Sequence, residues 1–300
     1  MTTEQRPGNA ARNLTLYTRA AQRSSARVIR EYSTSFSMAT RLLDRRIRPD
    51  VENIYGLVRV ADEIVDGAAL EAGLGLAVQR ELLDAFENET VSALRVGYST
   101  NLIVHSFAVT ARAVGIGTKL TTPFFASMRR DLSPVGFTED ELRKYIYGSA
   151  EVVGLMCLKV FLRESSLGNA ERQRLEHGAQ RLGAAFQKIN FLRDLSTDWG
   201  GLGRDYLPGV DPENLTEAQK LVLLADIDAD LLAAAAVIPE LPRGCRAAIA
   251  AAHGLFSALT ERIRAKPAAN LLRSRTRVPN ATKLGILLRA TTSQTVGRRK

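Results

Sequence analysis

Hydrophobic positions recur every three to four residues along almost the whole chain, which is the spacing of amphipathic helices. No run of alternating β-branched and polar residues is long enough to predict a sheet. Thr138 and Glu141 form the pattern of a capping box, and Pro134 and Gly168 mark helix ends. The pattern predicts an all-α chain, with helices at about residues 11–31, 33–44, 47–67, 76–94, 99–114, 119–132, 138–164, 169–199, 216–238, 243–265 and 281–297.

These helices are expected to form one domain that covers residues 1–300, because no internal repeat and no Pro/Gly/Ser-rich linker divides the chain. Residues 1–10 are polar, lack the apolar region of a signal peptide and are expected to be disordered. Residues 200–216 form the longest irregular stretch. This stretch is rich in Gly and Pro, and long loops in compact domains are often functional, so we expect an active-site loop or lid here.

The composition favours a reduced, cytoplasmic protein. The chain is 45% hydrophobic, but no apolar run approaches the roughly 18–20 residues that a membrane span needs. Its two cysteines, Cys157 and Cys245, have no metal-ligand spacing and do not suggest a disulfide framework. The three histidines (His105, His177 and His253) are interpreted as structural or surface residues.

Charge is unevenly placed along the chain. Residues 1–50 have a net charge of +6, residues 243–300 of +12 and residues 51–242 of −9. The basic ends suit anionic lipid headgroups or nucleic acid, although they also fit an ordinary solvated surface. The acidic centre suits bound cations better than bare phosphates, and no nucleic-acid-binding motif is present.

The first acidic motif is Asp62-Glu-Ile-Val-Asp66, with Arg59 three residues before it. On a helix, Asp62 and Asp66 share one face. Two like charges at this spacing repel each other unless a cation lies between them. The motif alone leaves open whether this is a cation site or a solvated acidic face beside an arginine.

The second motif runs from Gln187 to Asp198. Gln187, Asn190, Asp194 and Asp198 lie on one helical stripe, which Arg193 borders, and the residues between them are largely apolar. A polar stripe on an otherwise apolar helix indicates a hydrated cavity or an ion site. Two such motifs, each with an adjacent arginine, are more specific than either one alone.

Together the motifs suggest chemistry on a diphosphate. Oxygen ligands in small number suit Mg²⁺, which bridges carboxylates to substrate phosphates. Arginines hold phosphate oxygens by charge-assisted hydrogen bonds. Metal and arginine would stabilise a departing diphosphate, and the allylic cation left behind needs a dry, apolar pocket such as helix bundles provide.

The order and content of the motifs resemble those of the squalene/phytoene synthase family, within the trans-isoprenyl diphosphate synthases. The resemblance covers about Tyr32 to Pro208, and the C-terminal third agrees only in length and helical character. The matching segments are Tyr32-Ser-Thr-Ser-Phe-Ser37, Tyr55 with Arg59-x-x-Asp62-x-x-x-Asp66, Tyr145-Ile-Tyr-Gly-Ser-Ala-Glu-Val-Val-Gly154, Gln187 to Asp198, and Gly203-Arg-Asp-Tyr-Leu-Pro208. Within the family, Glu31–Ser37 and Gly183–Asp194 are most similar to actinobacterial phytoene synthases.

This resemblance implies a single helical bundle of the isoprenoid synthase type with a central cavity, and it assigns roles by position. Metal ligands are expected at Asp62, Asp66, Asn190, Asp194 and Asp198. Diphosphate is expected at Arg59, Arg193 and Arg204, with Asp62, Asp66, Asp194, Asp198, Arg59 and Arg193 as the catalytic set. Further substrate contacts are expected from Ser35, Phe36, Tyr55, Tyr147, Gln187 and Tyr206, although Phe36 and the tyrosines also fit ordinary core positions.

The chain departs from the family pattern at two points. Many relatives have Asp-Asp where this chain has Asp62-Glu63, but Asp62 and Asp66, the outer ligands, are retained. Many relatives begin the N-terminal segment with His-Ser-Lys, whereas this chain has Tyr32-Ser33-Thr34. The second change removes a cation, so contacts from Tyr32 and Thr34 to diphosphate stay open.

The resemblance implies that two geranylgeranyl diphosphates condense head to head, through a cyclopropyl diphosphate, to phytoene in carotenoid biosynthesis. Mg²⁺ or Mn²⁺ is the expected cofactor, and NADPH is not expected, since no dinucleotide fingerprint is present. The alternatives are a squalene, dehydrosqualene or presqualene diphosphate synthase acting on farnesyl diphosphate. A non-catalytic lipid-binding or assembly factor ranks lower, because all four motif aspartates are retained.

The expected partners follow from the product, which is too apolar to leave into water. We expect a cytoplasmic enzyme that touches anionic membrane peripherally at its inner face, does not bind nucleic acid and passes its product to later carotenoid enzymes.

Overall fold

A computed structural model describes the backbone of residues 7–133, 136–202 and 206–296, and the side chains of these residues except 7–11, 197–202, 212 and 292–296. The described chain is helical and contains no strand, which confirms the predicted all-α class. The α-helices are α1 (Pro7–Tyr32), α2 (Thr34–Thr40), α3 (Arg48–Val65), α4 (Ala68–Glu71), α5 (Leu76–Val96), α6 (Leu102–Val114), α7 (Thr118–Asp131), α8 (Glu139–Ile146), α9 (Val152–Phe161), α10 (Asn169–Leu202), α11 (Glu217–Val237), α12 (Arg243–Ala265) and α13 (Asn280–Val296). A π-helix, η1 (Tyr147–Glu151), joins α8 to α9, and short 3₁₀ helices lie at η2 (Pro212–Asn214), η3 (Ile238–Glu240) and η4 (Ala268–Asn270).

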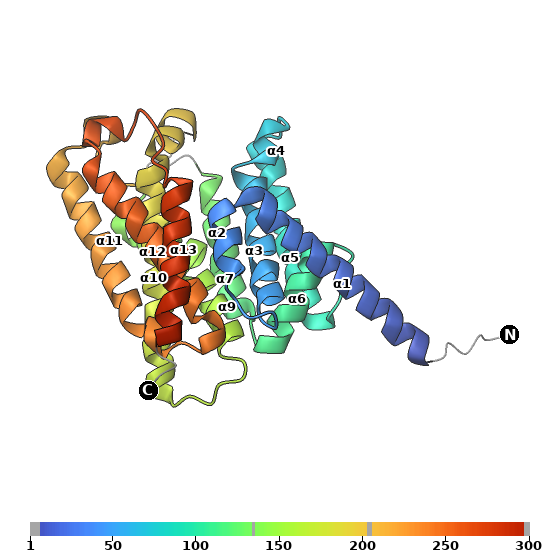
Figure 1. Ribbon diagram of the computed structural model, residues 1–300. Helices are drawn as coiled ribbons and strands as arrows, with labels where there is room; N and C mark the ends of the chain where they lie inside the picture. The colour runs from blue at the N-terminus through green and yellow to red at the C-terminus, as the bar shows by residue number, and fades with distance from the viewer. Residues whose placement is uncertain (1–6, 134–135, 203–205, 297–300) are drawn as a thin grey trace.

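The helices form a bundle with two sides (Figure 1). The long helix α10 packs with α11 and α12 on one side, and α3 packs with α1, α5 and α6 on the other. Helices α2, α7 and α9 lie between the two groups. Helix α10 therefore faces α3 across the middle of the bundle, and these two helices carry the two acidic motifs.

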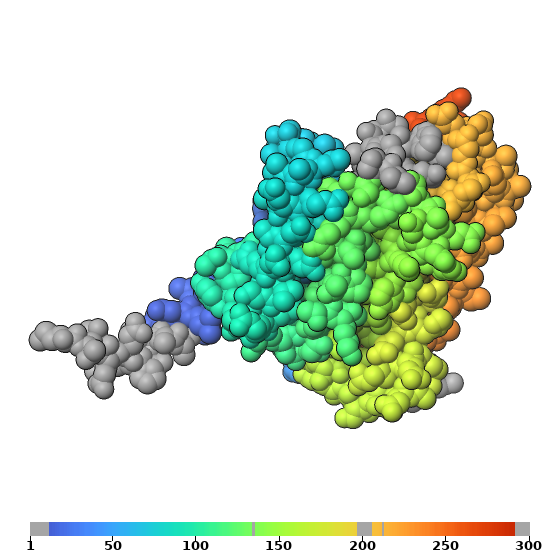
Figure 2. Space-filling view, turned by 180° about the vertical axis from the view of Figure 1, so that it is seen from behind, coloured from blue at the N-terminus to red at the C-terminus, as the bar shows by residue number. Residues whose placement is uncertain are grey.

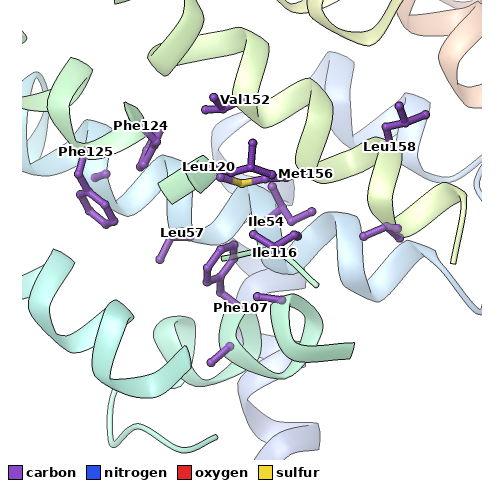
Figure 3. Packing of buried hydrophobic residues seen from close by; sticks show 14 of the residues in the cluster. Ile54, Leu57, Phe107, Ile116, Leu120, Phe124, Phe125, Val152, Met156 and Leu158 are labelled. Carbon is purple, nitrogen blue, oxygen red and sulfur yellow. The ribbon is translucent and has the colours of Figure 1, made fainter. Parts of the chain in front are cut away.

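Each side of the bundle has its own apolar core. Figure 3 shows the first, where Ile54, Leu57 and Phe107 meet Phe124 and Met156, all at most 1% exposed. The second core lies between α10, α11 and α12 and includes Ile189, Leu192, Leu224, Ile227 and Ile263. Full burial of each such side chain contributes about 1.5–3 kcal/mol, so the cores fix the helices that border the space between them.

Helix α1 reaches beyond the body of the bundle at its N-terminal end, which is visible from both sides (Figures 1 and 2). Buried hydrogen bonds hold its inner part to α6. Ser25 Oγ lies 2.7 Å from Ser106 Oγ, and Thr18 Oγ1 lies 2.9 Å from Nε2 of the fully buried His105. His105 is thus a structural residue in this part of the fold.

Several predicted boundaries are wrong by a few residues. Helix α1 begins at Pro7 and α10 ends at Leu202, whereas the helices predicted there begin at residue 11 and end at residue 199. The helix predicted at 33–44 ends at Thr40, because the chain turns there and the Asp44 amide donates to the Gly244 carbonyl instead.

The helix predicted at 138–164 is also wrong in detail, since it contains the π-helix and ends at Phe161. Gly148 explains the close packing of this segment. A Cβ atom there would overlap the carbonyl oxygen of Pro123 and the hydroxyl of Ser127 on α7. A glycine is therefore required where η1 crosses α7, and π-helical turns of this kind often occur at functional sites.

None of the helices in the described ranges is both long enough and apolar enough to cross a membrane.

Candidate active site

A cavity of about 620 Å³ lies between the two sides of the bundle. Its walls come from the end of α1 and from α2, α3, α7, η1, α9, α10 and α12. Most of the lining is apolar, and the acidic motifs of α3 and α10 contribute charged groups to it. A long apolar molecule with one charged end fits such a division.

The first acidic motif lies at the C-terminal end of α3. Asp62 and Asp66 both line the cavity, together with Arg59. Arg59 forms an ion pair with Glu63, lies 4.0 Å from Asp62 (Nη1 to Oδ2) and stacks over the Tyr32 ring at 4.4 Å. The sequence did not indicate that Glu63 is the main partner of this arginine.

Asp62 is unfavourably placed for a negative charge. Burial raises its pKa to about 7, and the nearby Asp66 charge adds to the shift while Arg59 opposes it. A bound cation would relieve both the desolvation and the repulsion, so this position suits a metal ion.

The second motif lies on α10, where Gln187, Asn190, Arg193 and Asp194 all line the cavity. Asp194 accepts two hydrogen bonds from Arg193, with 2.9 Å from Nε to Oδ1 and 2.5 Å from Nη2 to Oδ2. Arg275, in the segment between α12 and α13, also pairs with Asp194, at 2.6 Å from Nε to Oδ1. This carboxylate is thus held by two arginines, one of them from the C-terminal third of the chain.

Three polar atoms in the cavity wall are buried without a hydrogen-bond partner among the described residues. They are Nε of Arg59, Oγ of Ser149 and Oδ1 of Asn190. A buried polar group left unpaired costs about 1–3 kcal/mol, so such atoms indicate a missing partner. A donor at Arg59 suits a phosphate oxygen, and an acceptor at Asn190 suits a metal ion or its bound water.

An aromatic wall faces the apolar part of the cavity. Phe36 lies between Tyr55 and Phe186, with its ring centroid 6.2 Å from each, and Phe186 stacks on Phe256 at 3.6 Å. Phe36, Tyr55 and Phe186 line the cavity. Aromatic faces carry partial negative charge and attract cations, so this wall suits a carbocation.

Comparisons with known proteins agree with this geometry. The profile of the squalene/phytoene synthase family matches residues 29–282, well over half of the chain. The chain belongs to the squalene/phytoene synthase family. It is therefore a prenyltransferase, and its substrates are prenyl diphosphates.

Individual relatives lie in the same family. The chain is 29% identical over 278 residues to the 15-cis-phytoene synthase of Paracoccus sp., covering 88% of each chain. It is 28% identical over 270 residues to the phytoene synthase of Mycobacterium tuberculosis, covering 83% of each.

Solved structures show the same fold. A dehydrosqualene synthase with bound ligand gives a TM-score of 0.75 at 20% identity, covering 93% of this chain and 98% of that one. The squalene synthase HpnC of Alicyclobacillus acidocaldarius gives a TM-score of 0.70 at 20% identity, covering 83% and 95%. These TM-scores show that the isoprenoid synthase fold is shared.

Most of the site residues predicted from the sequence meet in the cavity. The described members are Phe36, Tyr55, Arg59, Asp62, Asp66, Gln187, Asn190, Arg193, Asp194 and Tyr206. Two others do not line it. Ser35 lies off the face of α2 that carries Phe36, and Tyr147 packs against the first core, because it faces away from the cavity-lining pair Tyr145 and Ser149. The Asp198 side chain and Arg204 lie outside the described residues.

Some cavity residues were missed by sequence reasoning. Tyr145 and Ser149 lie within the matching segment Tyr145–Gly154, so that segment was the available signal. Asp131 and Arg275 belong to none of the motifs recognised in the sequence, and only tertiary packing brings them to the cavity.

The donors in the cavity fit Mg²⁺. No three His, Cys, Asp or Glu side chains within the described ranges lie close enough together to hold a metal by themselves. Mg²⁺ in phosphate-transferring sites typically uses one or two carboxylates plus substrate oxygens and water. The carboxylate of Asp62, whose pKa is raised, and the unpaired Oδ1 of Asn190 are oxygen ligands of this kind, and they come from two facing helices.

Proposed function

We propose that this cavity joins two molecules of geranylgeranyl diphosphate head to head to give phytoene, with Mg²⁺ or Mn²⁺ and without NADPH. The observation that carries the proposal is that both acidic motifs and the unpaired Arg59 and Asn190 atoms line one largely apolar cavity. The choice of product rests on the curated relatives named phytoene synthase, which outrank the squalene-type structures in identity to this chain.

Different residues would bind the metal and the diphosphate. Asp62 and Asp66 on α3 and Asn190, Asp194 and Asp198 on α10 would hold the metal, which would neutralise the diphosphate as it leaves. Arg59 would donate to phosphate oxygens through its unpaired Nε. Arg193 and Arg275, which now pair with Asp194, would donate to the same phosphates if Asp194 bound the metal instead.

The reaction then proceeds on the apolar side. The allylic C–O bond of one substrate breaks, and the electron pair leaves with diphosphate. The double bond of the second substrate attacks the allylic cation, and loss of a proton closes a cyclopropyl diphosphate. This intermediate loses its own diphosphate, rearranges and loses a proton. The aromatic wall of Phe36, Tyr55 and Phe186 would stabilise the cations and exclude water.

The main alternative within the family is farnesyl diphosphate as substrate, with dehydrosqualene, squalene or presqualene diphosphate as product. Purified protein is incubated with Mg²⁺ and either prenyl diphosphate, with and without NADPH, and the products are identified by mass spectrometry. We expect phytoene from geranylgeranyl diphosphate, at a rate that NADPH does not change. Faster turnover of farnesyl diphosphate, or a hydrocarbon formed only with NADPH, would contradict the proposal.

We further propose that the enzyme works in the cytoplasm and touches anionic membrane at the mouth of the cavity. Arg275 lines the cavity, and Arg273 and Arg277 beside it are exposed. Leu70 and Leu76 are 46% and 53% exposed around α4, which follows directly on cavity residues Asp66 and Gly67. Figure 1 places α4 and the segment between α12 and α13 at the same end of the bundle. Such a surface would pass an apolar product to lipid and to later carotenoid enzymes.

A further inference from the structure

Asp131 is a buried acidic residue that belongs to neither aspartate motif. It is the last residue of α7, is 6% exposed and lines the cavity. A carboxylate in so dry a position requires hydrogen-bond donors, because burying an unpaired charge is very costly.

Two tyrosines supply donors. The Tyr206 hydroxyl donates to Oδ1 of Asp131 at 3.0 Å. Burial, followed by the charge of Asp131 and a side-chain hydrogen bond with it, raises the pKa of the Tyr145 hydroxyl well above its usual value. Both tyrosines line the cavity, and they come from distant parts of the chain, α8 and the segment after α10. One carboxylate thus sets the direction of two hydroxyl groups.

The rings themselves are held by packing. Tyr206 stacks on Phe191 at 4.5 Å and on Phe137 at 5.5 Å, and its centroid lies 5.5 Å from that of Tyr145. Tyr145 is 5% exposed and Tyr206 7%. A tyrosine side chain has only two main torsions, so this packing leaves rotation of the hydroxyl hydrogen about the C–O bond as the main remaining freedom. The hydrogen bond to Asp131 restricts that rotation.

The pair also lies near the first acidic motif. The Asp66 charge is close enough to contribute, after burial and the Asp131 charge, to raising the Tyr145 pKa well above its usual value. Both tyrosines and Asp131 line the same cavity as Asp62 and Asp66, where the allylic C–O bond would break.

We propose that Asp131 is a positioning residue: it draws the protons of Tyr145 and Tyr206 to itself, so that their oxygen lone pairs face the positive charge that develops near Asp66. This inference rests on the proposed function. A hydroxyl that points its oxygen at a cation stabilises it, whereas one that points its proton there destabilises it. The same arrangement keeps the phenol protons away from the alkenes of the substrate.

The test compares Asp131→Asn and Tyr206→Phe with a matched control. Asp230→Asn changes an equally buried aspartate, 4% exposed, that pairs with Arg181 and Lys188 and does not line the cavity. We expect Asp131→Asn to lower kcat by about 10- to 100-fold, with KM changed by less than about threefold, because the hydroxyls act on the transition state rather than on binding. Asp230→Asn should leave kcat within about threefold of the wild type. The melting temperature of Asp230→Asn should fall by about as much as that of Asp131→Asn.

Product analysis gives a second readout. In Asp131→Asn the amide NH₂ would donate to one hydroxyl and turn its proton into the cavity, so we expect more alcohol from capture of the cation by water. Combining Asp131→Asn with Tyr206→Phe should cost less than the product of the two single effects, because both act through one hydrogen bond.

The possible outcomes distinguish failure of this inference from failure of the proposed function. Wild-type kcat and product ratio in both Asp131→Asn and Tyr206→Phe would overturn the inference, as would equal losses in Asp131→Asn and Asp230→Asn. If Asp131→Asn does not fold, Tyr206→Phe, which removes only one hydroxyl, decides alone. Failure of the wild type to form any hydrocarbon would instead contradict the proposed function.

Discussion

At the scale of single residues, the site is defined by polar groups that the described side chains do not fully satisfy. Asp62 is held beside Asp66 in a partly desolvated position, and its pKa rises to about 7. The unpaired atoms of Arg59 and Asn190 point to the same conclusion from the side of hydrogen bonding. These features lower the free energy of unfolding, and a bound cation and diphosphate would supply the missing partners.

We therefore expect Asp62→Asn to stabilise the metal-free protein. A carboxyl whose pKa is raised on folding favours the folded state at low pH and loses this contribution as the pH rises toward 7. The side chain is 35% exposed, so solvent screening reduces the gain at pH 8 to about 1 kcal/mol. Urea unfolding in EDTA measures this gain, which should shrink as the pH falls from 7 toward 4.

Asp228→Asn is the control, because Asp228 forms a surface ion pair with Arg264 away from the cavity. Its unfolding free energy should change by no more than about 0.5 kcal/mol. Destabilisation by Asp62→Asn at pH 8 would show that the carboxylate has a structural role.

At the scale of elements, the helices and both motif stripes could be predicted from the sequence, because side chains three and four apart share a helical face. Gln187, Asn190 and Asp194 line the cavity for this reason. The π-helix could not be predicted, since its residues carry the same hydrophobic spacing as an α-helix. Tyr145, Ser149 and Val153 line the cavity at four-residue spacing, and Tyr147, two residues after Tyr145, lies off that face.

Asp131 and Arg275 were missed for a different reason. Each reaches the site through tertiary packing alone, and Arg275 lies in an arginine-rich segment that looks like ordinary surface charge. No local pattern distinguishes such residues from solvated ones.

The contact between η1 and α7 is expected to tolerate no side chain at Gly148. Gly148→Ala should lower the free energy of unfolding by about 1–3 kcal/mol, because the new methyl group overlaps the backbone of Pro123 and the Ser127 hydroxyl. Thermal or urea unfolding measures the loss. Gly168→Ala is the control, since a Cβ there meets nothing within 4 Å, and its effect should stay within about 0.5 kcal/mol. Equal effects of the two changes would refute the close-packing account.

At the scale of the whole molecule, residues 243–300 have a net charge of +12, and the basic residues among those that the structure describes do not form one surface. Arg243 begins α12, while Arg273 and Arg277 follow its other end, next to Arg275 at the cavity. Arg264 is paired with Asp228 and Glu261. Within the described chain, the exposed arginines Arg273 and Arg277 are the ones that lie beside the cavity residue Arg275.

The double variant Arg273→Gln/Arg277→Gln should weaken binding to anionic vesicles by about tenfold, because each arginine near a charged bilayer contributes up to about 1 kcal/mol. Vesicle co-sedimentation at low salt measures binding, and high salt should release the protein. Arg95→Gln/Arg243→Gln removes two exposed arginines far from the mouth and should have little effect. Equal recovery on neutral and anionic lipid, independent of salt, would reject membrane contact.

The most direct test of the whole account is the amount of diphosphate released per molecule of hydrocarbon formed from geranylgeranyl diphosphate. Head-to-head condensation through a cyclopropyl diphosphate releases two diphosphates per phytoene, and both releases should require Mg²⁺. We therefore expect a ratio of two with Mg²⁺ and no release of either product in EDTA. Full release in EDTA, or diphosphate released without hydrocarbon, would contradict the assignment of this cavity as a metal-dependent head-to-head prenyl synthase.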